Sequence, residues 1–246
     1  MRDDLHDAYA MVEWAVTHIP IMQQRLRDWI NSEPYRLVIE SDPLDRGWDL
    51  LVAYPDKPLD PLISVDLGAI LNSIRSALDL LAAAISNRNG VLTNGRTQFF
   101  IREREADAEG AWDGAKREQW LSETDLSKIK GLRPYSGGDS MLWPLHRLDI
   151  IRKHHRFVSA EPEIDTAMVT HAYWRPAPLW QNSLNDKTVL CRTATGVTFT
   201  PSKGNTKISA RVIINEAALN LHGEPAIELV RAYARRVADI IAMFDE

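Results

Sequence analysis

The chain has 246 residues, of which 45% are hydrophobic and 26% are charged, and its net charge at pH 7 is −5. A chain of this length and composition can form one large globular domain with a sizeable core. Its acidic balance argues against general binding to nucleic acid or to anionic membranes.

The first part of the chain is predicted to contain a long helix followed by a β-hairpin. Apolar residues recur at spacings of three and four over residues 4–32, which predicts a helix with one apolar face. Pro20 lies inside this stretch and should kink the helix or split it in two. Alternating apolar and polar residues on both sides of the turn-rich residues 41–47 predict a hairpin over residues 36–54.

A second long helix is expected from about Asp66, its N-cap, to Ser86. It is apolar almost all round from residue 78 to residue 85, so we expect it to be the central buried helix. Weaker helical patterns follow over residues 106–120, 124–130 and 140–155. The glycine-rich residues 136–138 lie before the last of these patterns and predict a turn.

After Arg156 the pattern changes to short β-branched segments. Pro, Gly, Asn and Asp separate these segments, which predicts an antiparallel sheet. The segments span residues 167–174, 188–193, 197–200 and 208–214. Residues 224–244 have the clearest helical periodicity in the chain. We therefore predict an α+β protein with a helical core of about four main helices, an N-terminal β-hairpin and a C-terminal antiparallel sheet.

We expect residues 1–246 to form a single domain in three parts. Residues 1–155 are the mainly helical part and include the hairpin at 36–54, whereas residues 156–220 are rich in strands. The helix at 224–244 is expected to return to the helical core, which it can reach only if the sheet lies to one side.

The sequence predicts a cytoplasmic protein. No run of about 18 apolar residues suggests a membrane span, and the acidic start lacks the apolar core of a secretory signal. Cys191 is the single cysteine, which excludes an intrachain disulfide, and its strand-like surroundings predict a buried apolar residue. The histidines lack HExxH-type spacing, so we expect no metal. Residues 136–138 resemble neither a Walker loop nor a dinucleotide fingerprint, and we expect no cofactor. We also expect no membrane partner.

One polar group lies on the otherwise apolar second helix. Asn72, Arg75, Ser76 and Asp79 are spaced at i, i+3, i+4 and i+7, so they share one face of the helix. Arg75 and Asp79 are one turn apart and can form an ion pair. We interpret this face as a structural ion pair at a solvated surface or an interface, with the wall of a polar pocket as the alternative.

A second polar group lies within residues 140–155. His146, Asp149 and Lys153 lie on the side opposite the apolar face of this predicted helix, and Asp149 and Lys153 form a favourable i, i+4 pair. His155 projects near the centre of the apolar face, so we expect it to be a capping or packed residue. If the two helices pack antiparallel, one ionic network can join both polar groups and fix the register of the helices. Its members would be Arg75, Asp79, His146, Asp149 and Lys153.

Arg147 and His154 form a separate pair on the same predicted helix. In projection they lie about 20° apart, with about 10 Å between them along the helix axis. They cannot hydrogen-bond to each other in a regular helix, but both can reach one phosphate-sized ligand.

Four short motifs resemble those of a widespread group of uncharacterised bacterial and phage proteins. Residues 70–81 resemble its "LRSALDHL" helix, Phe99-Phe100-Ile101 its "FPI" patch, Arg133-Pro134-Tyr135 its "QPY" motif and residues 145–155 its "LHRLDNIDKHR" helix. The order and spacing of the motifs cover roughly residues 36–158. The group has no established reaction, so the resemblance implies a fold more than a function.

The chain departs from this pattern at both helices. Asn72, Ser73 and Leu80 replace a His, an Asn and a His of the first motif. Arg152 and His155 replace the Asp and the Arg of "DKHR" in the last motif. If the group is enzymatic, these changes imply an altered or inactive member.

A more distant resemblance is to helical ribonucleases of the HEPN type, which use an Arg followed by four to six residues and a His, often at a homodimer interface. Arg147 and His154 have six residues between them and fit this spacing, although Leu148 stands where a polar residue usually follows the Arg. The resemblance implies a metal-independent reaction. In it, the His transfers protons near neutral pH and the Arg stabilises the charge that develops on the phosphorane.

The function therefore stays open between three hypotheses. In the first, the polar helix residues are structural or bind a partner, and the protein has no assigned activity. In the second, it is a HEPN-like endoribonuclease or toxin that acts on RNA as a homodimer through Arg147 and His154. In the third, His146, Asp149 and His154 hold a small ligand or a metal ion.

Overall fold

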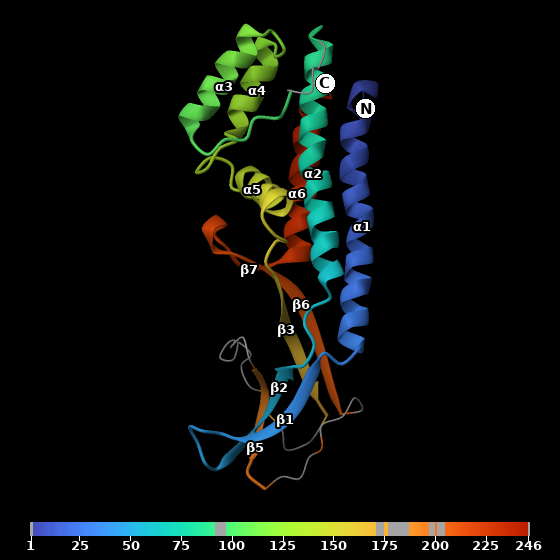
Figure 1. Cartoon of the computed structure of the whole chain (residues 1–246), viewed down its shortest axis with the longest axis vertical. Helices are drawn as coiled ribbons and strands as arrows, with labels where there is room; N and C mark the ends of the chain where they lie inside the picture. Colours follow the sequence, from blue (N-terminus) through green and yellow to red (C-terminus); the bar gives the residue numbers. More distant parts are fainter. Residues whose placement is uncertain are drawn as a thin grey trace.

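The computed structural model describes residues 2–91, 97–170, 175–176, 187–196, 200 and 205–245. The helices are α1 (His6–Asn31), α2 (Pro61–Arg88), α3 (Glu105–Arg117), α4 (Glu123–Leu132), α5 (Leu142–His154) and α6 (Ala226–Ala242). The strands are β1 (Tyr35–Ser41), β2 (Trp48–Pro55), β3 (Ala160–Val169), β4 (Arg175–Pro176), β5 (Thr188–Ala194), β6 (Thr206–Glu216) and β7 (Leu221–Pro225). Figure 1 shows the helices toward one end of the molecule and the strands toward the other, which confirms the predicted α+β class.

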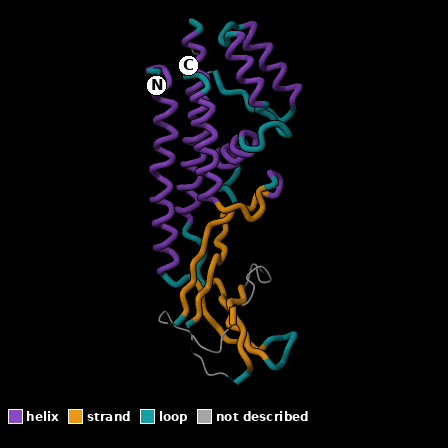
Figure 2. Tube along the Cα trace, turned by 180° about the vertical axis from the view of Figure 1, so that it is seen from behind, coloured by secondary structure: helices purple, strands orange, loops and turns teal. Residues whose placement is uncertain are grey.

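The helical end is built around three long helices that lie side by side, α1, α2 and α6 (Figures 1 and 2). Their apolar faces share one buried cluster, to which α2 contributes residues along nearly its whole length. Among the described residues, α2 is the one helix long and apolar enough to cross a membrane, but 67% of its most apolar window is buried inside the protein. Its composition is therefore explained by its central place in the core. That the whole chain forms one domain stays a prediction.

Helix α1 continues through Pro20 as one α-helix, so the predicted split is not observed. Pro20 lies on the exposed side of the helix, and so does Val16, whose carbonyl loses its partner because proline has no N–H group. Water can bind this carbonyl on the exposed side, whereas a buried one would lack any partner.

Helix α2 begins before the predicted N-cap, so the assignment of Asp66 as the cap is wrong. Asp60 is the cap, and its Oδ1 accepts a hydrogen bond of 2.9 Å from the Leu62 N–H group. Pro61 occupies the first helical position, where a residue without an N–H group is favoured. Asp66 lies inside the helix and pairs with Arg25 of α1 at 2.8 Å.

The last turn of α2 holds the two ends of the described chain together. The Arg88 guanidinium donates to Asp4 near the start of α1 and to the Phe244 carbonyl just after α6. The two ends accordingly lie at the same end of the helical part in Figure 1.

The strands form two antiparallel sheets in the described part of the chain, with orders β1-β2-β5-β4 and β3-β6-β7. The predicted hairpin is confirmed as β1 and β2, and β3-β6-β7 is the C-terminal sheet. The strand predicted at 188–193 lies elsewhere, because β5 pairs with β2 of the hairpin. Leu51 and Ala53 of β2 pack with Leu190 and Cys191 of β5 in a second buried cluster, which this pairing closes. Burial raises the pKa of the Cys191 thiol to about 12, in keeping with its predicted apolar role.

Two strands differ from the sequence prediction because they lie at the edges of their sheet. β3 begins at Ala160 rather than near residue 167, and β7 was not predicted at all. Among the described strands each pairs only with β6, so Pro162 and Pro225 are tolerated there and the apolar alternation is weak. The predicted strand residues 171–174 and 197–199 lie outside the described residues.

The turn between α4 and α5 fixes the position of α5 relative to α4. Arg133 ends α4 in the left-handed conformation, and its carbonyl accepts the N–H groups of Tyr135 and Asp139. The chain passes this carbonyl so closely that a Cβ atom at Gly138 would lie 2.1 Å from the oxygen. The predicted glycine turn is therefore required by close backbone contact.

We predict that Gly138→Ala destabilises the protein by about 2 kcal/mol or more, because the added methyl group overlaps a backbone atom that cannot rotate away. Urea unfolding of both proteins measures this loss. Gly110→Ala is the matched control, since Gly110 lies inside α3 and a Cβ atom added there would have nothing within 4 Å. That change should stabilise the helix by up to about 1 kcal/mol. Equal effects of the two substitutions would contradict the steric argument.

Candidate functional site

Helix α5 is held from its start by Asp139. One carboxylate oxygen of Asp139 accepts the N–H groups of Met141 and Leu142 at 2.8 and 2.9 Å, and the other pairs with Arg236 of α6 at 2.6 Å. Leu145 enters the main buried cluster. Helix α5 lies across α2 rather than along it (Figure 1), so the antiparallel packing considered for these two helices is not observed.

The first polar contact between α2 and α5 centres on Arg75, which is 4% exposed. Its Nη1 atom pairs with Asp79 at 2.7 Å, its Nη2 atom donates to the Phe99 carbonyl at 3.1 Å, and its Nε atom donates to His146 Nδ1 at 3.3 Å. Asp79 also accepts the Phe99 N–H group at 2.9 Å. The predicted Arg75–Asp79 pair is thus present at an interface that joins α2, the Phe99 segment and α5.

The hydrogen bond from Arg75 determines which nitrogen of His146 carries the proton. A guanidinium can only donate, so Nδ1 must be the acceptor and the neutral ring carries its hydrogen on Nε2. Burial lowers the pKa of His146 to about 4, and the nearby charges of Arg75, Arg102 and Arg147 act in the same direction, against Asp149. His146 is therefore an uncharged donor at neutral pH.

Two of these arginines have no carboxylate partner in the described part of the chain. The Arg102 guanidinium lies 5.2 Å from the centre of the Phe100 ring, and that of Arg147 lies 5.6 Å from the centre of the Trp143 ring. A ring face attracts a cation but leaves its charge available to an anion. The sequence pattern gave no signal for Arg102, which follows the "FPI"-like motif and is brought toward His146 only by the fold.

The second polar contact between α2 and α5 centres on Asp149, which is 3% exposed. Lys153 pairs with it at 2.6 Å and Arg152 at 3.5 Å, and Arg152 also donates to Asn72 of α2 at 3.0 Å. The stem of Arg152 lies against Gly68, where an added Cβ atom would be 2.5 Å from the Arg152 side chain. The expected five-residue network is therefore realised as two clusters, and the described residues show no hydrogen bond between them.

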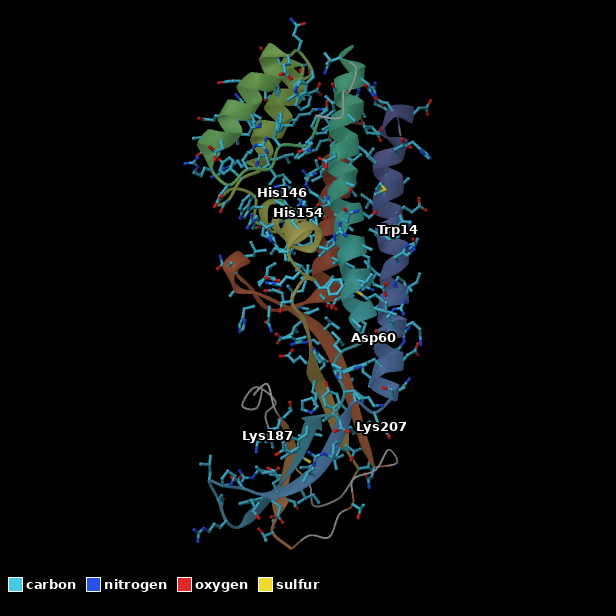
Figure 3. The ribbon with its side chains drawn as sticks, viewed as in Figure 1. Trp14, Asp60, His146, His154, Lys187 and Lys207 are labelled. Atoms are coloured by element: carbon cyan, nitrogen blue, oxygen red, sulfur yellow. The ribbon has the colours of Figure 1, made fainter. Side chains whose placement is uncertain are left out.

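The other candidate residues of α5 are less buried. Arg147 is half-buried, His154 is exposed in the last turn, and no contact joins the two side chains. Figure 3 labels His146 and His154 on this helix. His155 is exposed rather than packed, so the interpretation of a packed residue is wrong. The helix ends at His154, and a helical projection no longer applies beyond it.

The residues of the metal hypothesis do not come together as a metal site. Within the described ranges, no group of three or more His, Cys, Asp or Glu residues lies close enough to hold a metal ion. Instead, the Nδ1 atom of His146 accepts a hydrogen bond from Arg75, and the carboxylate of Asp149 pairs with Lys153.

Comparisons with known proteins identify no relative of this chain. No protein-family profile, curated protein or solved structure matches the chain. The two resemblances therefore depend on the residues quoted for them.

We predict that Asp149→Asn destabilises the protein by about 2 kcal/mol, because Lys153 and Arg152 lose a buried anion. Chemical unfolding at pH 7 measures the change. Asp107→Asn removes the anion of the solvent-exposed Arg104–Asp107 pair and should change stability little. If Asp149→Asn lowered the free energy of unfolding no more than this control does, the buried cluster would add no stability.

The lowered pKa of His146 predicts a stability that depends on pH. In the unfolded chain the ring protonates near its usual pKa of 6.5, whereas in the folded protein it does so near 4. As pH falls through this window the unfolded state binds the proton first, so stability is full above it and decreases toward pH 4. The free energy of unfolding of the wild type and of His146→Gln should be measured at several pH values. The difference between the two free energies should change by up to about 3 kcal/mol across this window. If the free energies of unfolding of the two proteins depended on pH in the same way, the lowered pKa of His146 would be ruled out.

Proposed function

We propose that this protein binds RNA along α5 and cleaves it without a metal ion, in the manner that its resemblance to HEPN-type ribonucleases implies. The observation that carries the proposal is the Arg147 guanidinium, which has no carboxylate partner in the described part of the chain. The next arginines along the chain differ, since Arg152 contacts Asp149 and Arg156 pairs with Glu216. A planar guanidinium left unpaired in an acidic protein is suited to bind a phosphate group.

His154 is the histidine suited to proton transfer in this proposal. It is exposed, whereas the pKa of about 4 keeps the His146 ring neutral and weakly basic. In the proposed step, His154 takes the proton of the ribose 2′-hydroxyl as this oxygen attacks phosphorus. The bond from phosphorus to the 5′-oxygen breaks, and the leaving oxygen takes a proton from solvent. Arg147 stabilises the negative charge of the phosphorane.

The acidic net charge does not oppose this proposal. A charge of −5 argues against broad electrostatic attraction to nucleic acid, but it does not prevent a local site that binds one or two phosphate groups. The exposed ring of Phe157 follows α5 by three residues and offers a surface on which a base can stack.

We propose a structural role for the polar residues buried between α2 and α5. Each nitrogen of Arg75 donates to a group of the protein, to Asp79, the Phe99 carbonyl or His146, which holds the guanidinium within the helix interface. Asp149 is likewise engaged within the protein. These residues support the first hypothesis, because they lock the position of the helix that carries the proposed site.

Membership of the uncharacterised bacterial and phage group is also a proposal. It is supported by contacts of three of the motifs with one another, and of the fourth motif with Arg102, the residue that directly follows Phe99-Phe100-Ile101. Arg75 contacts both Phe99 and His146, and the N–H group of Arg102 donates to the Pro134 carbonyl at 3.0 Å. Motifs that meet in space are expected to be constrained together. The HEPN resemblance further implies a homodimer.

The proposal predicts that purified protein cleaves single-stranded RNA in excess EDTA. His154→Ala should lower the cleavage rate by about a hundredfold or more and leave RNA binding nearly intact. Arg147→Ala should weaken both binding and cleavage. Cleavage of labelled oligonucleotides on gels and binding by fluorescence anisotropy measure the two effects.

Arg27→Ala is the control, since Arg27 is an exposed arginine of α1 whose hydrogen bonds, among the described residues, go to Gln24 alone. It should behave as wild type in both measurements. The absence of any cleavage by folded wild-type protein, or an unchanged rate in His154→Ala, would rule out the proposed reaction. Circular dichroism of each variant shows that the fold is retained.

A further inference from the structure

We propose that Arg102, His146 and Arg147 form a phosphate-binding subsite, in which His146 acts as an uncharged hydrogen-bond donor that Arg75 holds in place. The assignment of the phosphate to RNA depends on the function proposed above. The binding of an oxyanion does not, because it follows from the charges and donors of these residues alone.

The first support is an excess of positive charge around His146. Arg75 of α2 donates to both His146 and the Phe99 carbonyl, which brings the segment that carries Arg102 beside α5. Arg147 follows His146 on α5, and the charges of Arg75, Arg102, Arg147 and Asp149 all act on the His146 ring. Both carboxylates are already engaged, Asp79 by Arg75 and Asp149 by Lys153. Asp107 of α3 also acts electrostatically on Arg102, but it pairs with Arg104 at 2.8 Å. Arg102 and Arg147 are thus left without an ion pair in the described part of the chain, although the chain has more acidic than basic residues.

The second support is the set of elements that hold the two arginines. The backbone of Arg102 is fixed by a hydrogen bond of 3.0 Å to the Pro134 carbonyl and by a parallel bridge to Tyr135. Arg147 lies on α5, whose start is tied to α6 through Asp139. The backbones of both arginines are therefore positioned before any ligand arrives, which lowers the entropy lost on binding.

The third support is the ring of His146 itself. Its Nδ1 atom accepts from Arg75, and its Nε2–H group has no hydrogen-bond partner in the described part of the chain. Protonation would place a second hydrogen on Nδ1, directly against the Arg75 donor, so the ring stays neutral. Arg102, His146 and Arg147 are each half-buried, so none of the three side chains is enclosed in the core.

Inorganic sulfate is the probe for this subsite, because its charge does not change between pH 5.5 and 8. Isothermal titration calorimetry on the full chain should show one bound sulfate, with the same affinity at pH 5.5 and pH 7.5. Arg102→Gln should weaken binding by about tenfold or more. His146→Asn should weaken it by several fold, because the Asn oxygen can still accept from Arg75 but the Nε2–H donor is lost.

Arg27→Gln is the control, since Arg27 is an exposed arginine of α1 whose hydrogen bonds in the described part of the chain go to Gln24. It should bind sulfate as wild type does. Failure of wild type to bind sulfate, or equal losses in the two arginine variants, would overturn the subsite. An affinity that rises about tenfold per pH unit on acidification would overturn the uncharged role of His146.

The same proteins separate this inference from the proposed function. Sulfate binding by a protein that does not cleave RNA would support the subsite and remove the ribonuclease proposal. RNA cleavage that is unchanged in Arg102→Gln, by a protein that binds no sulfate, would support the ribonuclease proposal and remove the subsite.

Discussion

The structure depends on the need to pair one buried charge. Arg75 lies within a helix that is otherwise apolar and central to the core, and an unpaired guanidinium there would cost several kcal/mol. Asp79 supplies the counter-charge at one nitrogen, while the Phe99 carbonyl and the His146 ring accept hydrogen bonds from the other two nitrogens. Each partner comes from a different segment. Pairing this charge therefore fixes where the Phe99 segment and α5 lie against α2, and with them every residue of the proposed site.

Local structure could be predicted from the sequence where periodicity was strong. The positions of α1, α2 and α6 and of the first hairpin follow from apolar spacing that one helix or strand pair satisfies by itself. The start of α2 could not, because its proline-rich entry resembles a linker until Asp60 is seen to cap it. The pairing of β5 with β2 was also missed, since strand partners far apart in sequence leave no local signal.

The site was predicted in part for the same reason. Helical spacing identified the Arg75–Asp79 and Asp149–Lys153 pairs, which lie within single helices. Helical spacing could not predict that α5 crosses α2, and for this reason two clusters are observed where a single network was expected. Arg102 and the Phe99 backbone join the site from a segment without regular structure. Asn72 of α2 and Arg152 of α5 contact each other, and the spacing within either helix gives no signal for this contact.

The place of α6 bears on how the chain folds during synthesis. This helix is synthesised well after α1 and α2, yet Val230, Tyr233 and Val237 fill the core beside those two helices. Until it emerges, the apolar surfaces that it will cover stay exposed, and Arg88 lacks its contact with residue 244. Nascent chains in this state are prone to aggregation and are typical clients of chaperones. A truncation that removes α6 should therefore affect the yield of folded protein far more than the loss of seventeen residues suggests.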